Sequence, residues 1–153
     1  MAKRILVPIE RSSAMEFTLR VVRMVACESG GIVRLLAVVP IPKPLRDARG
    51  AILLTTDQRM ERMTMAMTEE LNRLAATHLD GVPVETSVIF GDRTDEIGLE
   101  AECFHADLVV LPLERRRSPA AWFTDRARRL LAGRPANEID VLRVSALRAQ
   151  PIA

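Results

Sequence analysis

The sequence predicts one α/β domain with a parallel β-sheet and helices on both faces, and three observations support this. The chain has 153 residues, 48% of them hydrophobic and 27% charged, which is the size and composition of one globular core. Short apolar runs alternate with amphipathic stretches of helical period. Strands that alternate with helices imply parallel pairing with right-handed crossovers. We therefore expect a single domain over residues 1–153, with its core at about 3–144 and a loose tail at 145–153.

Five short apolar runs have the length of strands: residues 5–9, 32–39, 84–90, 107–111 and 139–144. Most are nearly continuous, which is typical of strands covered on both faces. The third run alternates, with Glu85 and Ser87 between apolar residues, so we expect a more exposed strand there. Three prolines follow the second run, and the stretch 43–56 is predicted to be irregular.

Four helices are predicted between these runs. The first begins at a capping box formed by Ser13 and Glu16 and ends at Gly30. Its apolar residues fall on one face or directly beside it: Phe17, Val21, Met24 and Val25 on the face, with Leu19, Val22 and Ala26 beside it.

The second helix is expected over residues 57–79. Its core stripe has spacings of three and four: Met60, Met63, Met67, Leu71, Leu74 and His78. Asp92 is the expected N-cap of the third helix. The third helix is expected to bury three residues: Ile97, Ala101 and Phe104. The fourth is expected over 120–131, with Trp122 and Phe123 in its core face.

Three stretches resemble a known family. Residues 3–10 read Lys-Arg-Ile-Leu-Val-Pro-Ile-Glu, and residues 35–40 read Leu-Leu-Ala-Val-Val-Pro. Gly91-Asp92 is followed by Glu96-Ile97 and then by Ala-Asp-Leu-Val-Val at 106–110. In order and spacing these stretches are similar to universal stress protein domains over residues 3–144. The resemblance implies a doubly wound, nucleotide-binding α-hydrolase-like sheet of order 3-2-1-4-5. It also implies a homodimer, which in the family is often paired through the last strand, here Ile139 to Val144. The alternative is that Arg143 inside this strand protects a sheet edge.

The resemblance also implies a ligand pocket at the carboxyl ends of strands 1 and 4, where nucleotide-binding members hold ATP. Three positions are compatible with the base and ribose end of that pocket: Pro8, Val38 and Leu111. The end of strand 1 departs from the family's Asp-Gly-Ser/Thr, because it reads Glu10-Arg11-Ser12, where Glu10 keeps the acid but is longer. The phosphate end departs from the family, because four residues stand where binding members have three glycines and a Ser or Thr: Pro112, Arg115, Asp125 and Arg126. Residues 113–132 contain no glycine. Because phosphates need close backbone N–H groups, ATP binding through a glycine loop is disfavoured, and no cofactor is predicted.

Residues 113–134 hold seven arginines against Glu114 and Asp125, a local charge near +5, although the whole chain is only +2. One interpretation is anion capture by Arg115 and Arg126. A nucleic-acid patch is disfavoured because aromatic residues are scarce, and a solvated basic face is the simplest interpretation. Glu10 is either a ribose contact or general base, or a strand-end acid paired with Arg11 or an arginine of 115–117; the structural interpretation is favoured.

Cys27 and Cys103 lie in apolar helical patterns and are expected to be free and buried. Cys103 and His105 lack any zinc-binding spacing, with His78 in another helix, so no metal is predicted. No Gly-x-Ser-x-Gly elbow is present, and no enzyme is predicted.

The first apolar run is too short for a secretion signal, and no run has membrane-spanning length, so a cytoplasmic protein is expected. The leading hypothesis is a regulatory stress-response module that acts by dimerisation or by contact with an unknown protein partner. The alternative is a sensor of a nucleotide, such as ATP or AMP, or of another anionic small molecule.

Overall fold

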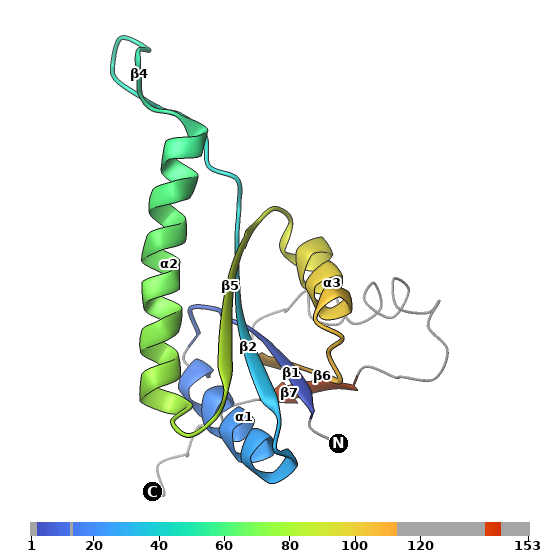
Figure 1. Ribbon diagram of the computed structural model, residues 1–153. Helices are drawn as coiled ribbons and strands as arrows, with labels where there is room; N and C mark the ends of the chain where they lie inside the picture. The colour runs from blue at the N-terminus through green and yellow to red at the C-terminus, as the bar shows by residue number, and fades with distance from the viewer. Residues whose placement is uncertain (1–2, 13, 113–139, 145–153) are drawn as a thin grey trace, which may run out of the picture.

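The computed structural model describes residues 3–12, 14–112 and 140–144 (Figure 1). Within them, five strands form one sheet: β1 (Arg4–Pro8), β2 (Ile32–Val39), β5 (Val84–Phe90), β6 (Leu108–Pro112) and β7 (Asp140–Val144). Their order is β5-β2-β1-β6-β7, and every neighbouring pair is parallel. The predicted sheet and its 3-2-1-4-5 order are confirmed.

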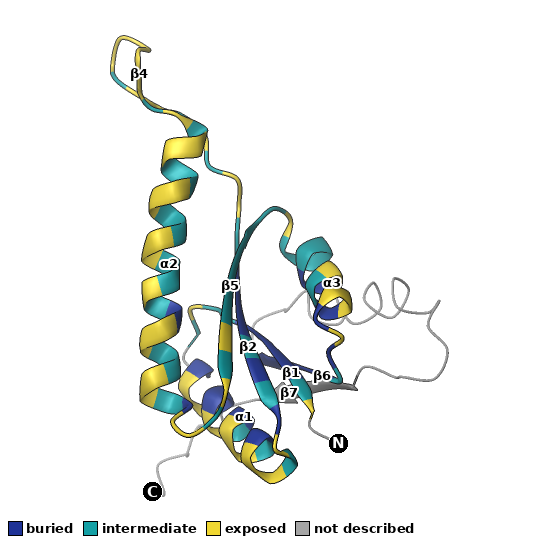
Figure 2. Ribbon diagram, viewed as in Figure 1, coloured by how far each residue is buried: buried dark blue, intermediate teal, exposed yellow. Residues whose placement is uncertain are grey.

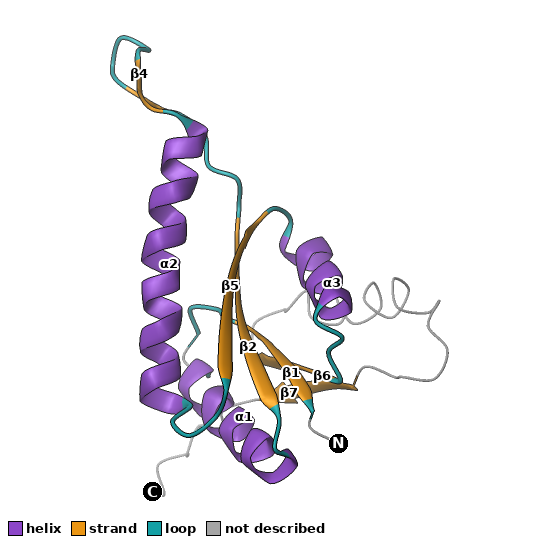
Figure 3. Cartoon of the chain, in the orientation of Figure 1, coloured by secondary structure: helices purple, strands orange, loops and turns teal. Residues whose placement is uncertain are grey.

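Helices cover the sheet on both faces, as Figure 3 shows. Three are described: α1 (Met15–Ser29), α2 (Thr56–His78) and α3 (Arg93–Cys103). Ile5 and Val7 of β1 pack in the core beneath α1 and α2, while Leu6 packs in a second core beneath α3. This alternation follows from the two-residue period of a strand, so β1 supplies both cores. The predicted fourth helix, at 120–131, lies outside the described residues.

The start of α1 differs from the prediction. Its N-cap is Ala14, which makes no side-chain capping hydrogen bond, and Ser13 lies outside the described residues. The proposed capping box is therefore wrong. The exposed side chain of Glu16 instead accepts a hydrogen bond from Arg20 one turn later.

The buried face of α1 is also rotated from the predicted one. The buried residues recur at spacings of three and four: Met15, Thr18, Leu19, Val22 and Ala26. Phe17 and Met24 are 45% and 57% exposed, so they do not belong to the core. Val21 and Val25 pack at its margin. Thr18 fits inside because its hydroxyl donates to the Ala14 carbonyl at 2.7 Å.

The stretch 43–56 is not irregular as predicted. It forms a hairpin of β3 (Leu45–Arg46) and β4 (Ile52–Leu54), whose turn is closed by Asp47 accepting from Arg49 N and Ala51 N. The hairpin leads directly into α2, whose N-cap is Thr55. Thr55 and Gln58 form a capping box, so α2 starts just before the predicted Asp57.

Only one residue of the predicted α2 stripe, Leu71, is fully buried. Met67 and Leu74 pack against the core edge, whereas Met60 and Met63 are half-buried. In Figure 2, exposed and intermediate positions alternate along α2, its one buried position lies in the second half, and its first turns extend beyond the sheet. The stripe is therefore core only at its carboxyl-terminal end.

The prediction for α3 is confirmed at its N-cap and at its buried face. Asp92 accepts from Asp95 N at 3.1 Å, and Ile97, Ala101 and Phe104 are buried. The burial predicted for the cysteines is wrong. Cys27 and Cys103 are free but exposed, because each falls on the solvent side of its helix.

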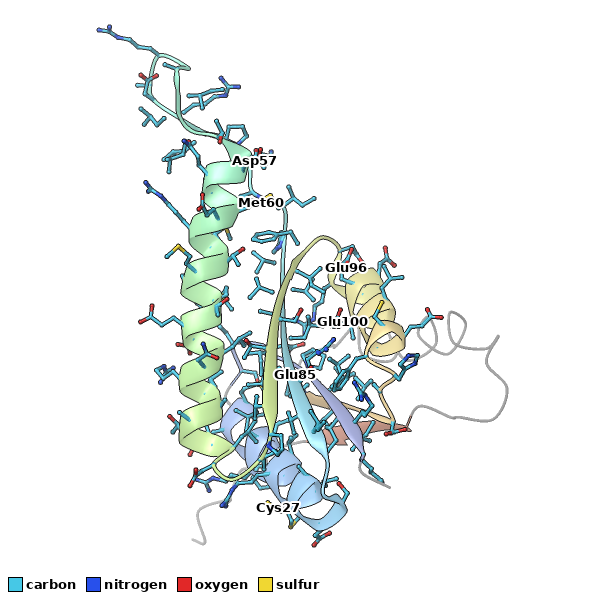
Figure 4. The ribbon with its side chains drawn as sticks, in the orientation of Figure 1. Cys27, Asp57, Met60, Glu85, Glu96 and Glu100 are labelled. Atoms are coloured by element: carbon cyan, nitrogen blue, oxygen red, sulfur yellow. The ribbon has the colours of Figure 1, made fainter. Side chains whose placement is uncertain are left out.

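An ionic cluster fixes α3 to the sheet. Arg34 of β2 donates to Glu85 of β5 at 2.6 Å and to Glu100 of α3 at 2.6 Å (Figure 4). Its guanidinium also lies 4.2 Å from the centre of the Phe104 ring, and that of Arg4 lies 4.6 Å from the same ring. Partial burial lowers the pKa of Arg34, but its hydrogen bonds and charge interactions with both glutamates outweigh this and raise it. The cluster thus joins the carboxyl-terminal half of α3 to β2 and β5.

Candidate functional site

The carboxyl edge of the sheet brings together the four predicted pocket residues that the structure describes. Pro8 ends β1 and Leu111 lies near the end of β6, and both are buried. Val38, near the end of β2, and Glu10, two residues after β1, are half-buried. The chain leaves β1 for β2 on one side, and β6 lies on the other, so this is a topological switch point of the sheet.

The main polar contact at this edge is an ion pair that the sequence did not reveal. Arg93 Nη2 donates to Glu10 Oε1, and both side chains are about one-third exposed, at 39% and 33%. Within the described residues, the ion-pair partner of Glu10 is thus Arg93 and not Arg11, while the arginines of 115–117, the other predicted partners, lie outside the described residues. Because Glu10 follows β1 and Arg93 follows β5, the pair passes across the end of β2, which lies between them.

Arg93 is held in place by the turn from β5 into α3. Gly91 N donates to Val39 O at 3.0 Å, and Gly91 has a φ of 151°. A Cβ on Gly91 would lie 2.8 Å from Glu96 Oε1, so both the backbone conformation and the space favour glycine. Asp92 then caps the helix, which makes Arg93 its first residue. This geometry gives a physical reason for the Gly91-Asp92 motif.

The loop from β1 to α1 uses its own backbone donors. Ser12 N donates to Glu10 O at 3.0 Å, and Ala14 N donates to Ser12 Oγ at 3.1 Å. Met15 N donates to Ser12 O at 3.2 Å. These N–H groups are already satisfied within the loop, so an incoming anion would have to displace local bonds to reach them.

The phosphate end of the predicted pocket is only partly described. Pro112 is buried at the end of β6 and has no backbone N–H to donate. Arg115 and Arg126, the predicted anion-binding pair, lie outside the described residues, as does Asp125. Their role therefore stays a prediction.

The described part of the chain has an open hollow elsewhere but no metal-binding cluster. Among residues 3–12, 14–112 and 140–144, no three His, Cys, Asp or Glu side chains are placed to hold a metal ion. An open hollow of about 770 Å³ lies on another surface, along α1 and the end of α2. It is lined by mixed charges and Cys27: Glu16, Arg20, Arg23, Met24, Cys27, Glu28, Thr77, His78 and Asp80. Within the described ranges, no helix is both long and apolar enough to cross a membrane.

Comparison with known proteins gives the family. The profile of the universal stress protein family matches residues 1–133. A search of curated proteins found no significant match.

Solved structures agree on the fold. The structure of the hypothetical protein MJ0577 has a TM-score of 0.68 at 18% identity, over 97% of this chain and 99% of that one. A universal stress protein in complex with cAMP has a TM-score of 0.60 at 16% identity, over 94% and 97% of the two chains. A family protein from Arabidopsis thaliana with AMP bound has a TM-score of 0.58 at 14% identity, over 95% and 93%. At these identities the likeness concerns the fold.

Proposed function

Because this chain belongs to the universal stress protein family, we propose that it is a non-enzymatic regulatory member which acts through protein contacts, including self-association. In this proposal, its carboxyl-edge site is occupied by the chain's own Glu10–Arg93 ion pair and does not hold ATP on a glycine loop. Pro112 at the end of β6 offers no N–H to a phosphate, and the second observation that carries the proposal is the ion pair. It engages the acid that, by family resemblance, would face a ribose.

The charges around the ion pair support this proposal. Asp92, Asp95 and Glu96 lie at the start of α3, beside Arg93. A triphosphate placed near Arg93 would also approach these three carboxylates and Glu10, and like charges at short range repel. Among the described residues of this edge, the paired Arg93 and the exposed Arg11 stand against four carboxylates, so the local charge there is negative.

The residues at the end of β6 also support the proposal. Pro112 offers no N–H, and residues 113–132 contain no glycine whose bare backbone could approach a phosphate. In the loop before α1, the N–H groups of Ser12, Ala14 and Met15 are already bonded within the loop.

A sensor of a nucleoside monophosphate or a similar anion is the second candidate. It is favoured by the apolar residues Pro8, Val38 and Leu111 at the edge, and by two similar structures, one in complex with cAMP and one with AMP bound. In such a sensor the ligand would have to break the Glu10–Arg93 pair. A half-exposed ion pair contributes about 0.2–1 kcal/mol, so breaking it would weaken binding only ~5-fold at most.

Calorimetric titration of nucleotide-stripped protein with ATP, AMP and adenosine tests the proposal. We expect no heat from ATP at millimolar concentration, and none for the Arg93→Met variant. Low-micromolar ATP binding would contradict the proposal. Binding of AMP alone, lost in Arg115→Ala and Arg126→Ala, would establish the sensor instead. The Arg20→Met variant is the matched control, because Arg20 forms an exposed ion pair on α1, away from this edge.

A further inference from the structure

The β3–β4 hairpin projects from the body of the molecule, beyond the carboxyl edge of the sheet (Figure 1). We call residues 41–55 the hairpin arm. Its strands pair only with each other, at Leu45 with Leu54 and Arg46 with Ile52. An isolated two-stranded hairpin without a packed face is marginally stable in water. The arm therefore has the form of an element that is completed by contact with another molecule.

The arm is also unusually apolar for an exposed element. Among the described residues, eight large hydrophobic side chains are exposed, and half of them belong to the arm: Ile41, Leu45, Ile52 and Leu53. Single exposed apolar residues are ordinary on a protein surface, but a concentration on one projecting element marks an interaction surface.

Cations accompany these apolar side chains. Lys43, Arg46 and Arg49 stand against Asp47, which gives residues 41–55 a formal charge of +2. Asp47 already accepts two backbone hydrogen bonds within the turn. In the described part of the chain, none of the three cations forms an ion pair, and Arg46 donates only to the Gly50 carbonyl. The arm thus offers positive charge to a partner.

The outer surface of α3 has the complementary character. Residues 92–103 carry five acids and one arginine, a formal charge of −4. Glu100 faces inward, where it pairs with Arg34, so the outer surface has the other four: Asp92, Asp95, Glu96 and Glu102. Leu99 stands among them, 54% exposed, and Glu102 is exposed beside it. The helix thus presents an apolar side chain within an acidic surface, where the arm presents apolar side chains among cations.

We propose that the hairpin arm of one molecule docks on the outer surface of α3 of a second copy of this chain. The arm of each copy contacts α3 of the other copy, so two identical contacts form and the assembly closes about a two-fold axis. Apolar contact between Leu53 and Leu99 forms its centre, and the charges form its rim. The inference rests on the self-association part of the proposed function and does not require any ligand at the carboxyl edge.

Cross-linking tests the docking directly. Two single-cysteine proteins, Leu53→Cys and Leu99→Cys, are made in a Cys27→Ser/Cys103→Ser background and mixed under mild oxidation. We expect an interchain disulfide between them. The matched control replaces Leu99→Cys by Met24→Cys, which is similarly exposed, at 57%, but lies on α1. Equal yields in the two mixtures would overturn the proposal.

Light scattering tests the charges. The Arg46→Glu/Arg49→Glu variant should weaken association on the order of tenfold or more, and adding Glu102→Lys should restore part of it. Arg20→Glu/Arg23→Glu, on α1, is the control, and circular dichroism verifies that each variant folds. An unchanged mass overturns the proposal. Vesicles of phosphatidylserine and phosphatidylcholine test a membrane as the partner instead. The proposal is also overturned if the wild-type protein binds these vesicles and the Arg46→Glu/Arg49→Glu variant has the same mass as the wild type.

The two proposals fail separately. ATP binding by the wild type would contradict the proposed use of the carboxyl edge and leave the cross-linking result standing. Absence of the cross-link in a protein that also binds no nucleotide would overturn only the arm docking.

Discussion

Replacing Arg34 by methionine should destabilise the fold, because this residue bridges two strands and a helix. Methionine keeps most of the aliphatic length and removes the charge. The loss has three parts: the ion pair with Glu85, the ion pair with Glu100, and the contact with the Phe104 ring.

The magnitude follows from the exposure of each contact. Glu85 is 49% exposed, so that pair contributes about 0.5 kcal/mol or less. Glu100 is only 12% exposed, and a hydrogen bond to a charged group of this kind contributes about 1.5–3 kcal/mol. The ring contact adds about 0.5 kcal/mol. Water entering the vacated site offsets part of this, and we expect a loss of about 2–3 kcal/mol.

Urea unfolding followed by circular dichroism measures this change at constant m-value. The double variant Arg34→Met/Glu100→Gln should lose less than the sum of the two single changes, because the neutral amide no longer leaves a charge without its partner. Arg20→Met, which removes an exposed pair on α1, should change stability by less than about 0.5 kcal/mol. Two results would contradict this role of Arg34. One is a loss of unfolding free energy in Arg34→Met no larger than in Arg20→Met, and the other is additive losses from the Arg34 and Glu100 changes.

Three further predictions concern α2. Leu71→Ala should lower the free energy of unfolding in urea by about 2.5–5 kcal/mol, because Leu71 is fully buried. Met65 is exposed, so Met65→Ala should lower it by less than ~0.5 kcal/mol. Equal losses in the two variants would contradict the assigned core. Thr55→Ala removes the capping box and should cost about 1 kcal/mol, read as a lower urea midpoint. The hydrogen bond from Arg73 holds the pKa of Glu70 below its usual value of 4.5. The ion pair therefore stabilises the fold above pH 4.5, and this stabilisation is lost as the pH falls through the lowered pKa of the folded protein. Carboxyl NMR titration of Arg73→Ala should show the pKa of Glu70 rising, and an unchanged value would exclude the pair.

The sequence determined the architecture because its signals are local and periodic. Continuous apolar runs identified β1, β2 and β6 as strands buried on both faces. The alternation in residues 84–90 predicted a more exposed strand, and β5 lies at the edge of the described sheet. Asp92 marked the start of α3 for the same reason, since an N-cap acts on backbone groups two or three residues away.

Where two local signals competed, the sequence was less informative. Ser13 and Glu16 have the spacing of a capping box, but α1 starts after Ala14. Phe17 and Met24 are apolar at helical spacing, yet the face that packs is the one through Leu19 and Val22. Packing against the sheet selects the buried face, and several apolar stripes on one helix compete for it.

Only the tertiary structure decided what Glu10 contacts. Its partner, Arg93, is 83 residues away, and the two meet because β5 and β1 flank β2 in the sheet. Likewise Arg34, Glu85 and Glu100 come from three elements and meet only after the sheet and α3 have packed. Periodicity and capping depend on neighbours within a few residues, so they can locate strands and helices, whereas an ion pair between distant elements depends on how the strands are ordered and where the helices lie.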